Sequence, residues 1–149
     1  MGKRGEGWVI LQMILLFIIA LAPRFEGFAF PDWLRLAGWV LMAGGALFGL
    51  AALPQLGANL TPFPRPRAGG ELVTSGVYAL VRHPIYAGLI VAAFGWALVR
   101  MNVLGLFLAL LLFAFFDLKS RREEAWLMEV YPDYADYRRR VKKLIPGIY

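Results

Sequence analysis

The chain contains no cysteine and is poor in charged residues. The absence of cysteine excludes disulfide bonds, thiolate metal sites and cysteine nucleophiles, and we expect no metal site. Only 17% of the 149 residues are charged, 60% are hydrophobic and the mean hydropathy is +0.60. These values exceed those of soluble domains of this size, so the composition predicts a protein that lies largely in the lipid bilayer. The length is that of one domain, with no room for a separate soluble one.

The formal net charge of +6 would suggest nucleic acid as a partner in a soluble protein. Here the basic residues flank apolar segments and cluster near the C-terminus. Membrane topology and contact with anionic lipid head groups explain this pattern better. We therefore expect membrane lipids, and no nucleic acid, as partners.

Four apolar runs are predicted to cross the membrane as helices: 7–23, 36–53, 84–99 and 101–116. The first also resembles a signal peptide, although Pro23 disfavours cleavage after residues 20–22. Pro54 is predicted to end the second helix. Small residues within that helix predict close contact with a neighbouring helix; they are Gly38, Ala43, Gly44, Gly45, Ala46 and Gly49. The third and fourth runs have 16 residues each and would be about 24 Å long as helices.

The segments outside these runs complete an all-α, polytopic helical bundle of about four transmembrane helices in a single domain, 1–149. Residues 55–81 are predicted to form a loop because prolines and glycines interrupt them. Residues 119–149 are predicted to form a helical cap on the membrane surface, broken at Pro132 and Pro146. A hairpin that turns near Arg100, Met101 and Asn102 would bring His83 and residues 117–124 to the same face of the membrane.

Lysines and arginines predict which face this is. Thirteen of them lie before the first run, in the 55–81 loop, at Arg82 and after the fourth run, and three lie on the opposite side. By the positive-inside rule the thirteen face the cytoplasm. We therefore expect both termini, the loop and the cap to be cytoplasmic, together with the active site.

Two clusters of side chains are candidates for chemistry. Arg82, His83 and Tyr86 lie at the start of the third apolar run, where polar groups are costly and often functional. Pro84 suits the first turn of a helix there. The second cluster, 119–124, carries both signs of charge. A lone histidine or a charged run is more often structural, but the two clusters together indicate a pocket for a zwitterionic cofactor.

Three motifs carry a specific resemblance. They are 72–78 (LVTSGVY), 82–88 (RHPIYAG), and the acidic pair Glu123 and Glu124 followed by Leu127, Tyr131, Tyr134 and Tyr137. In this order and at this spacing the chain resembles the isoprenylcysteine carboxyl methyltransferase family and the wider group that includes phospholipid N-methyltransferases. The resemblance covers residues 71–146, about half of the chain.

The resemblance implies binding of S-adenosylmethionine by a defined set of residues: Leu72, Val73, Tyr78, His83, Pro84, Ile85, Tyr86, Glu123 and Glu124. The arginine that orients the substrate in the family aligns with Lys119, which keeps the charge but loses the bidentate fork. Arg82 is the other candidate for orienting an anionic acceptor. A cofactor-contacting glutamine of the family, upstream of Leu72, has no clear counterpart in the 62–66 stretch.

The predicted function is methyl transfer from S-adenosylmethionine to a lipid-like acceptor that enters between helices. A carboxylate acceptor is favoured, because it is ionised at neutral pH and needs no general base, whereas a protonated amine would first lose a proton. A phospholipid amine and an apolar thiol remain open as acceptors, and the sequence predicts no oligomeric state. The alternatives are an NADPH-dependent reductase of the sterol type, which has a similar His-Pro and tyrosine pattern, and a non-enzymatic membrane scaffold.

Overall fold

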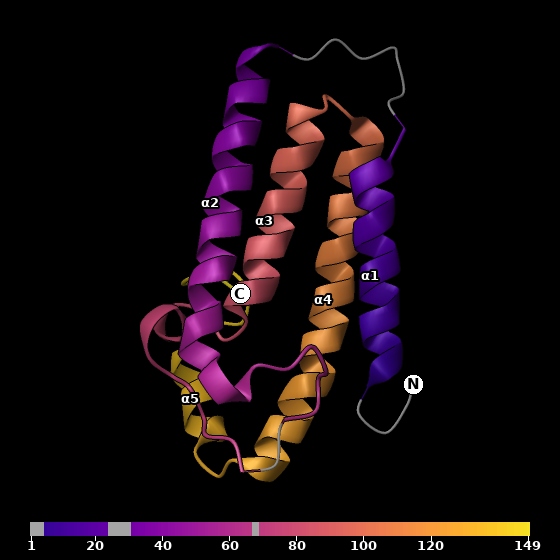
Figure 1. Cartoon of the computed structure of the whole chain (residues 1–149). Coiled ribbons are helices and arrows are strands. Elements are labelled where there is room, and N and C mark those ends of the chain that lie inside the picture. Colours follow the sequence, from indigo (N-terminus) through magenta and orange to yellow (C-terminus); the bar gives the residue numbers. More distant parts are fainter. Residues whose placement is uncertain (1–4, 24–30, 67–68) are drawn as a thin grey trace.

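The computed structural model describes residues 5–23, 31–66 and 69–149. Four long helices run roughly side by side (Figure 1): α1 (Glu6–Leu21), α2 (Trp33–Leu56), α3 (Pro84–Val99) and α4 (Val103–Val130). A short helix, α5 (Tyr134–Arg140), and two 3-10 turns, η1 (Gly57–Asn59) and η2 (Gly76–Ala79), lie at one end of the bundle. Within the described residues the only β contact is an isolated bridge between Val81 and Lys142. The expected all-α class is confirmed.

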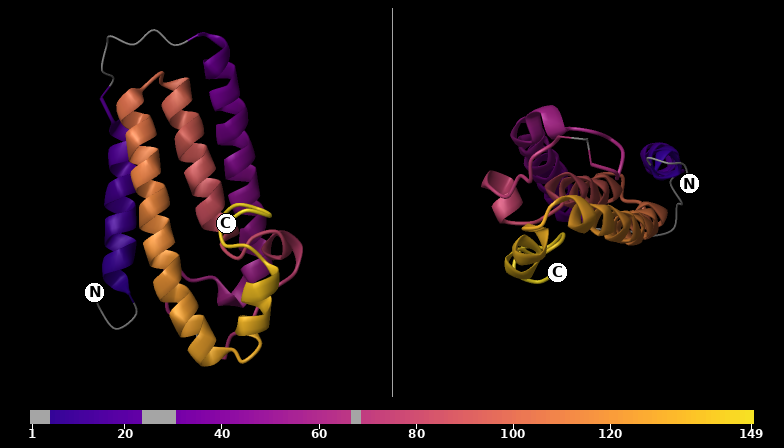
Figure 2. Two further views of the ribbon diagram at one scale, coloured as in Figure 1. Left: turned by 180° about the vertical axis from the view of Figure 1, so that it is seen from behind. Right: turned by 90° about the horizontal axis from the view of Figure 1, so that it is seen from below.

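The helices pack in the order α2, α3, α4, α1, with α3 between α2 and α4 (Figure 2). Helices α2 and α3 approach most closely through glycines. A Cβ atom added at Gly45 would lie 2.7 Å from the backbone nitrogen of Ala92 and from the backbone oxygen of Gly88. Gly44, by contrast, faces open space, with no atom within 4 Å of such a Cβ. Small residues therefore bring the two backbones together, as expected, but only on one face of α2.

Two helical segments, residues 33–59 and 103–130, are long and apolar enough to cross a membrane, whereas α1 and α3 are apolar but have 16 residues each. Large hydrophobic side chains are exposed along the outside of the bundle, among them Ile10, Phe17, Leu36 and Leu47. A surface of this kind suits lipid rather than water. Four crossings remain a prediction.

The predicted helix boundaries agree at α3 and differ at α2 and α4. Helix α3 begins at Pro84 and ends at Val99, as predicted. The prediction that Pro54 ends α2 is wrong, because the helix continues through it to Leu56. Near a helix end the missing N–H of proline costs one hydrogen bond, and the side chain of Gln55 donates to the carbonyl of Ala51 (3.1 Å). Helix α4 continues beyond residue 116 to Val130, so residues 119–130 extend that helix.

The α3–α4 hairpin turns at residues 100–102, as predicted. The side chain of Asn102 donates to the carbonyl of Pro23 (3.1 Å), which fastens the turn to the end of α1. At the other end of the hairpin the chain returns after α5 to the start of α3. There the N–H of Arg82 donates to the carbonyl of Lys142 (2.8 Å), and the N–H of His83 donates to that of Lys143 (3.1 Å). The hairpin thus places the start of α3 beside the charged half of α4.

Candidate active site

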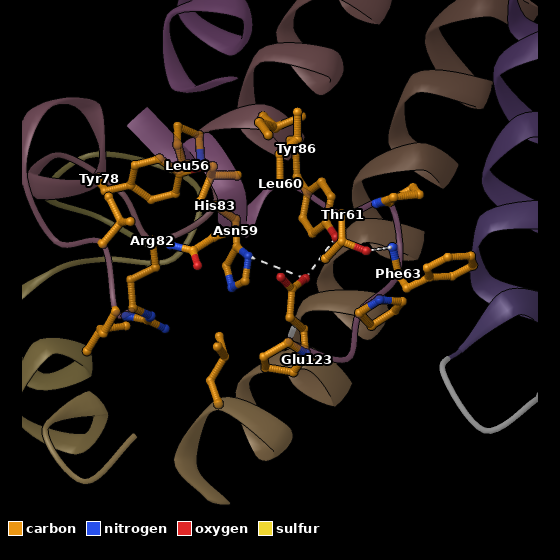
Figure 3. Close-up of a pocket in the computed structure, with 18 of the residues that line it drawn as sticks. Leu56, Asn59, Leu60, Thr61, Phe63, Tyr78, Arg82, His83, Tyr86 and Glu123 are labelled. Carbon is orange, nitrogen blue, oxygen red and sulfur yellow. Dashed lines mark hydrogen bonds and ion pairs between the residues drawn. The ribbon is translucent and has the colours of Figure 1, made fainter. Parts of the chain in front are cut away.

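A cavity of about 400 Å³ lies at this end of the bundle. Its walls come from the start of α3, the charged half of α4, the first turn of α5 and the loop between α2 and α3 (Figure 3). The loop is held in shape by Asn59, whose side chain donates to the carbonyl of Glu71 (3.0 Å) and accepts from its N–H (3.2 Å). A cavity of this size can enclose a cofactor or a drug-sized ligand.

The two predicted clusters meet at this cavity. Nε2 of His83 lies 3.1 Å from Oε1 of Glu124, although the residues are 41 positions apart. The same oxygen accepts from Nε of Arg82 (2.9 Å) and lies 2.8 Å from Nη2 of that residue. The prediction that the start of the third helix and the acidic pair converge is therefore confirmed.

Glu124 is a buried anion that contacts residues of the cavity wall but does not line the cavity itself. Its side chain is 3% exposed, and it contacts the cations of Arg82 and Arg138. Burial alone would raise the pKa of Glu124, but the hydrogen bond from His83 and the charge of Arg82 lower it to about 2. The carboxylate is therefore ionised at neutral pH and fixes the position of the imidazole.

Glu123, the neighbouring acid, faces the cavity. Its Oε2 accepts a hydrogen bond from the hydroxyl of Tyr86 (2.8 Å) and lies 3.9 Å from Nδ1 of His83 (Figure 3). The rings of His83 and Tyr86 stack with 5.4 Å between centroids, and Tyr86 stacks on Phe116 at 4.5 Å. These contacts hold the carboxylate of Glu123 in place, so the cavity presents a fixed negative charge beside aromatic surface.

Lys119 lies on the α1 side of the cavity and is 1% exposed. Its Nζ donates to Oε1 of Gln12 on α1 and lies 5.0 Å from the ring centroid of Tyr86. Burial lowers the pKa of Lys119, and the negative charge of Glu123 opposes that shift. The side chain of Tyr86 therefore contacts both the amine of Lys119 and the carboxylate of Glu123. A basic and an acidic side chain line the same cavity.

Tyrosines close the cavity on the side of α5. The hydroxyl of Tyr137 donates to the carbonyl of Tyr78 (2.6 Å), which ties α5 to η2. The hydroxyl of Tyr134 is buried and has no hydrogen-bond partner among the described residues. Burial raises the pKa of Tyr78, Tyr134 and Tyr137, so all three hydroxyls keep their protons at neutral pH. The hydroxyl of Tyr134 is thus a buried donor without a partner in the described part of the chain, in a residue that lines the cavity.

Ten of the predicted site residues line the cavity, and Glu124 lies behind it. The ten are Leu72, Val73, Tyr78, Arg82, His83, Pro84, Ile85, Tyr86, Lys119 and Glu123. The guanidinium of Arg82 is directed to Glu124 and to the carbonyls of Arg138 and Val141, so its hydrogen bonds join elements of the protein. Its predicted role in orienting an acceptor would require it to leave these partners.

Sequence reasoning missed Gln12 and Asn59 as cavity residues. A signal for Gln12 was present, because it is the only polar side chain between Trp8 and Pro23, and polar groups at membrane depth are usually functional or paired. Asn59 carried no comparable signal, because its position in a turn is typical of asparagine.

Comparison with known proteins assigns the family. Residues 33–134 match the family model described as phospholipid methyltransferase. The chain belongs to this family. Among curated relatives it is 42% identical over 83 residues to protein-S-isoprenylcysteine O-methyltransferase of Schizosaccharomyces pombe, covering 52% of this chain and 34% of that protein. It is 32% identical over 120 residues to the Mus musculus protein of the same name, covering 78% of this chain and 42% of that protein. The resemblance to isoprenylcysteine methyltransferases is thereby confirmed.

The chain is also similar to a curated protein with a different name. The chain is 32% identical over 108 residues to cobalt-zinc-cadmium resistance protein CzcN of Cupriavidus metallidurans, covering 66% of this chain and 50% of that protein. The chain therefore spans between about a third and a half of these three relatives. The matched residues, 33–134, include the whole α3–α4 hairpin together with Arg82, His83, Glu123 and Glu124. They do not include Gln12.

Proposed function

We propose that the chain is an S-adenosylmethionine-dependent methyltransferase that acts on the carboxylate of an isoprenylcysteine-like lipid at the cytoplasmic face of the membrane. The observation that carries the proposal is the meeting of His83, Tyr86 and Glu123 in one cavity between the ends of a helical hairpin. The names of the isoprenylcysteine methyltransferase relatives support the reaction type.

The residues of the cavity suit the methyl donor. S-adenosylmethionine would supply an electrophilic methyl group on a sulfonium and carries an ammonium and a carboxylate of its own. Glu123 provides a fixed anion for a cationic group of the donor. Leu72, Val73 and Ile85 provide apolar wall. A site with fixed dipoles and little water favours a reaction in which charges are lost.

Lys119 would orient the acceptor. It lies on the side of the cavity formed by α1 and α4, whose outer surfaces are apolar. A buried cation there would attract a carboxylate on a lipid tail that enters between helices. Methyl transfer to a carboxylate requires no base, so the residues need only bind, orient and exclude water.

The test is binding followed by turnover with the purified chain in detergent. We expect labelled S-adenosylmethionine to bind and NADPH not to bind; binding of NADPH alone would favour the reductase alternative. With the donor present, a small S-prenylated cysteine should become a base-labile methyl ester, while phosphatidylethanolamine stays unmodified. Methylation of the amine lipid instead would overturn the carboxylate assignment and keep the enzyme class. Binding of neither cofactor would favour the scaffold.

A further inference from the structure

A second pocket, of about 420 Å³, lies on the other side of Arg82 from the candidate active site. Six basic side chains line it together with two residues near the end of the chain: Arg82, Arg121, Arg138, Arg139, Lys142, Lys143, Ile148 and Tyr149. None of these except Arg82 lines the first cavity. The proposed methyl transfer makes no use of this pocket.

The pocket keeps an excess of positive charge after its ion pairs are counted. Three side-chain carboxylates pair with the lining cations: Asp117, Asp136 and Glu124. Asp117 contacts both Arg121 and Lys143 at 2.7 Å. Lys142 has no carboxylate partner in the part of the chain that the structure describes. The excess stays positive when the α-carboxylate of Tyr149 is included, so an anion would be attracted into the pocket.

The place of the pocket in the fold indicates the source of the anion. Asp117 and Arg121 lie in the first turns of α4 beyond the predicted span 101–116, and the bridge to Val81 holds Lys142 beside the start of α3. Both positions are at the predicted level of the lipid head groups. Ile148, at the rim, is 76% exposed, which gives apolar surface next to the cations. Guanidinium groups bind phosphate oxygens in pairs.

We propose that this pocket binds the phosphate of an anionic membrane phospholipid. The lipid phosphate would lie among Arg121, Arg139 and Lys142, and its acyl chains would run along the apolar surface of α4. Basic pockets beside transmembrane helices on the cytoplasmic side are suited to such head groups. The proposal concerns lipid binding and does not depend on methyl transfer.

The test measures lipids retained by the purified full chain. In native mass spectrometry with mixed phosphatidylglycerol and phosphatidylcholine, we expect preferential retention of phosphatidylglycerol. The double variant Arg121→Gln/Lys142→Gln should weaken this binding by about tenfold. Both side chains are exposed, so the variant should fold.

The matched control is Arg122→Gln/Arg140→Gln, which removes the same charge from two exposed positions that do not line the pocket. It should retain phosphatidylglycerol as the natural chain does. Equal retention of the two lipids, or equal losses in both double variants, would overturn the proposal. Displacement of phosphatidylglycerol by inorganic phosphate would assign the pocket to a soluble anion and overturn the lipid assignment.

Discussion

Helix α3 is held at its middle and at its start by opposite kinds of contact. At its middle it lies against α2 at glycines, where backbone meets backbone, as at Gly45 beside Gly88 and Ala92. At its start it is held by the buried group of His83, Arg82 and Glu124. The first contact tolerates no added volume, and the second tolerates no missing partner. Helix α3 is therefore tightly packed along its apolar length, and the polar contacts that can take part in chemistry lie just before its first residue.

The largest effect is expected from adding volume to the apolar contact. The variant Gly45→Leu should prevent accumulation of the folded chain, because the atoms that its Cβ would meet at 2.7 Å are backbone atoms and cannot move aside. Thermal unfolding of the detergent-purified protein and its yield measure this. The control Gly44→Leu, whose Cβ meets open space, should unfold at nearly the natural temperature. Similar behaviour of the two variants would mean that α2 and α3 are not in close contact.

Removing a partner from the polar contact should have the next largest effect. The variant Glu124→Gln leaves the buried cation of Arg82 without its carboxylate and should lower the free energy of unfolding by about 3 kcal/mol. Denaturant unfolding in detergent measures the change. If the variant were as stable as the natural chain, the buried group of Arg82, His83 and Glu124 would not stabilise the start of α3.

The neighbouring acid should affect binding instead of stability. The variant Glu123→Gln keeps an acceptor for the hydroxyl of Tyr86 but loses the charge that faces the cavity. We expect the dissociation constant of S-adenosylmethionine to rise by about tenfold, the value of one charge-assisted hydrogen bond. Equilibrium binding measures it, with the exposed Glu129→Gln on the same helix as control. Equal affinity of the two variants for S-adenosylmethionine would mean that Glu123 does not bind the donor.

The acid dependence of stability tests the same buried carboxylate by titration. Because the folded-state pKa of Glu124 is about 2, below the ordinary 4.5, its contribution is complete above about 4.5 and is lost as the pH falls toward 2. The melting temperature should fall over this range, and less steeply in Glu124→Gln. Asp117, whose pKa is lowered from 3.8 to about 2 by hydrogen bonds that outweigh its burial, titrates nearby, so Asp117→Asn is measured in parallel. An unchanged slope in Glu124→Gln would contradict the assignment.

The sequence was sufficient to predict the α3–α4 hairpin and the meeting of two polar clusters at its open end. These clusters are the residues around His83 and residues 119–124. Pro84 and the residues of the turn gave local signals, and helix geometry placed the ends together. The partners of Arg82 were not predictable, because the carbonyls of Arg138 and Val141 that it binds lie 56 and 59 positions along the chain. The misjudged end of α2 has a different cause: a proline within the last turn costs little.

The bond between His83 and Glu124 has a consequence for the imidazole itself. The carboxylate oxygen of Glu124 at Nε2 accepts a hydrogen bond and cannot donate one, so a neutral His83 carries its hydrogen on Nε2. This tautomer leaves the lone pair of Nδ1 near the carboxylate of Glu123, 3.9 Å away. Two acceptors that face each other repel, unless an N–H or O–H donor lies between them. A ligand that brings such a donor to this gap would relieve the repulsion and be selected for its orientation.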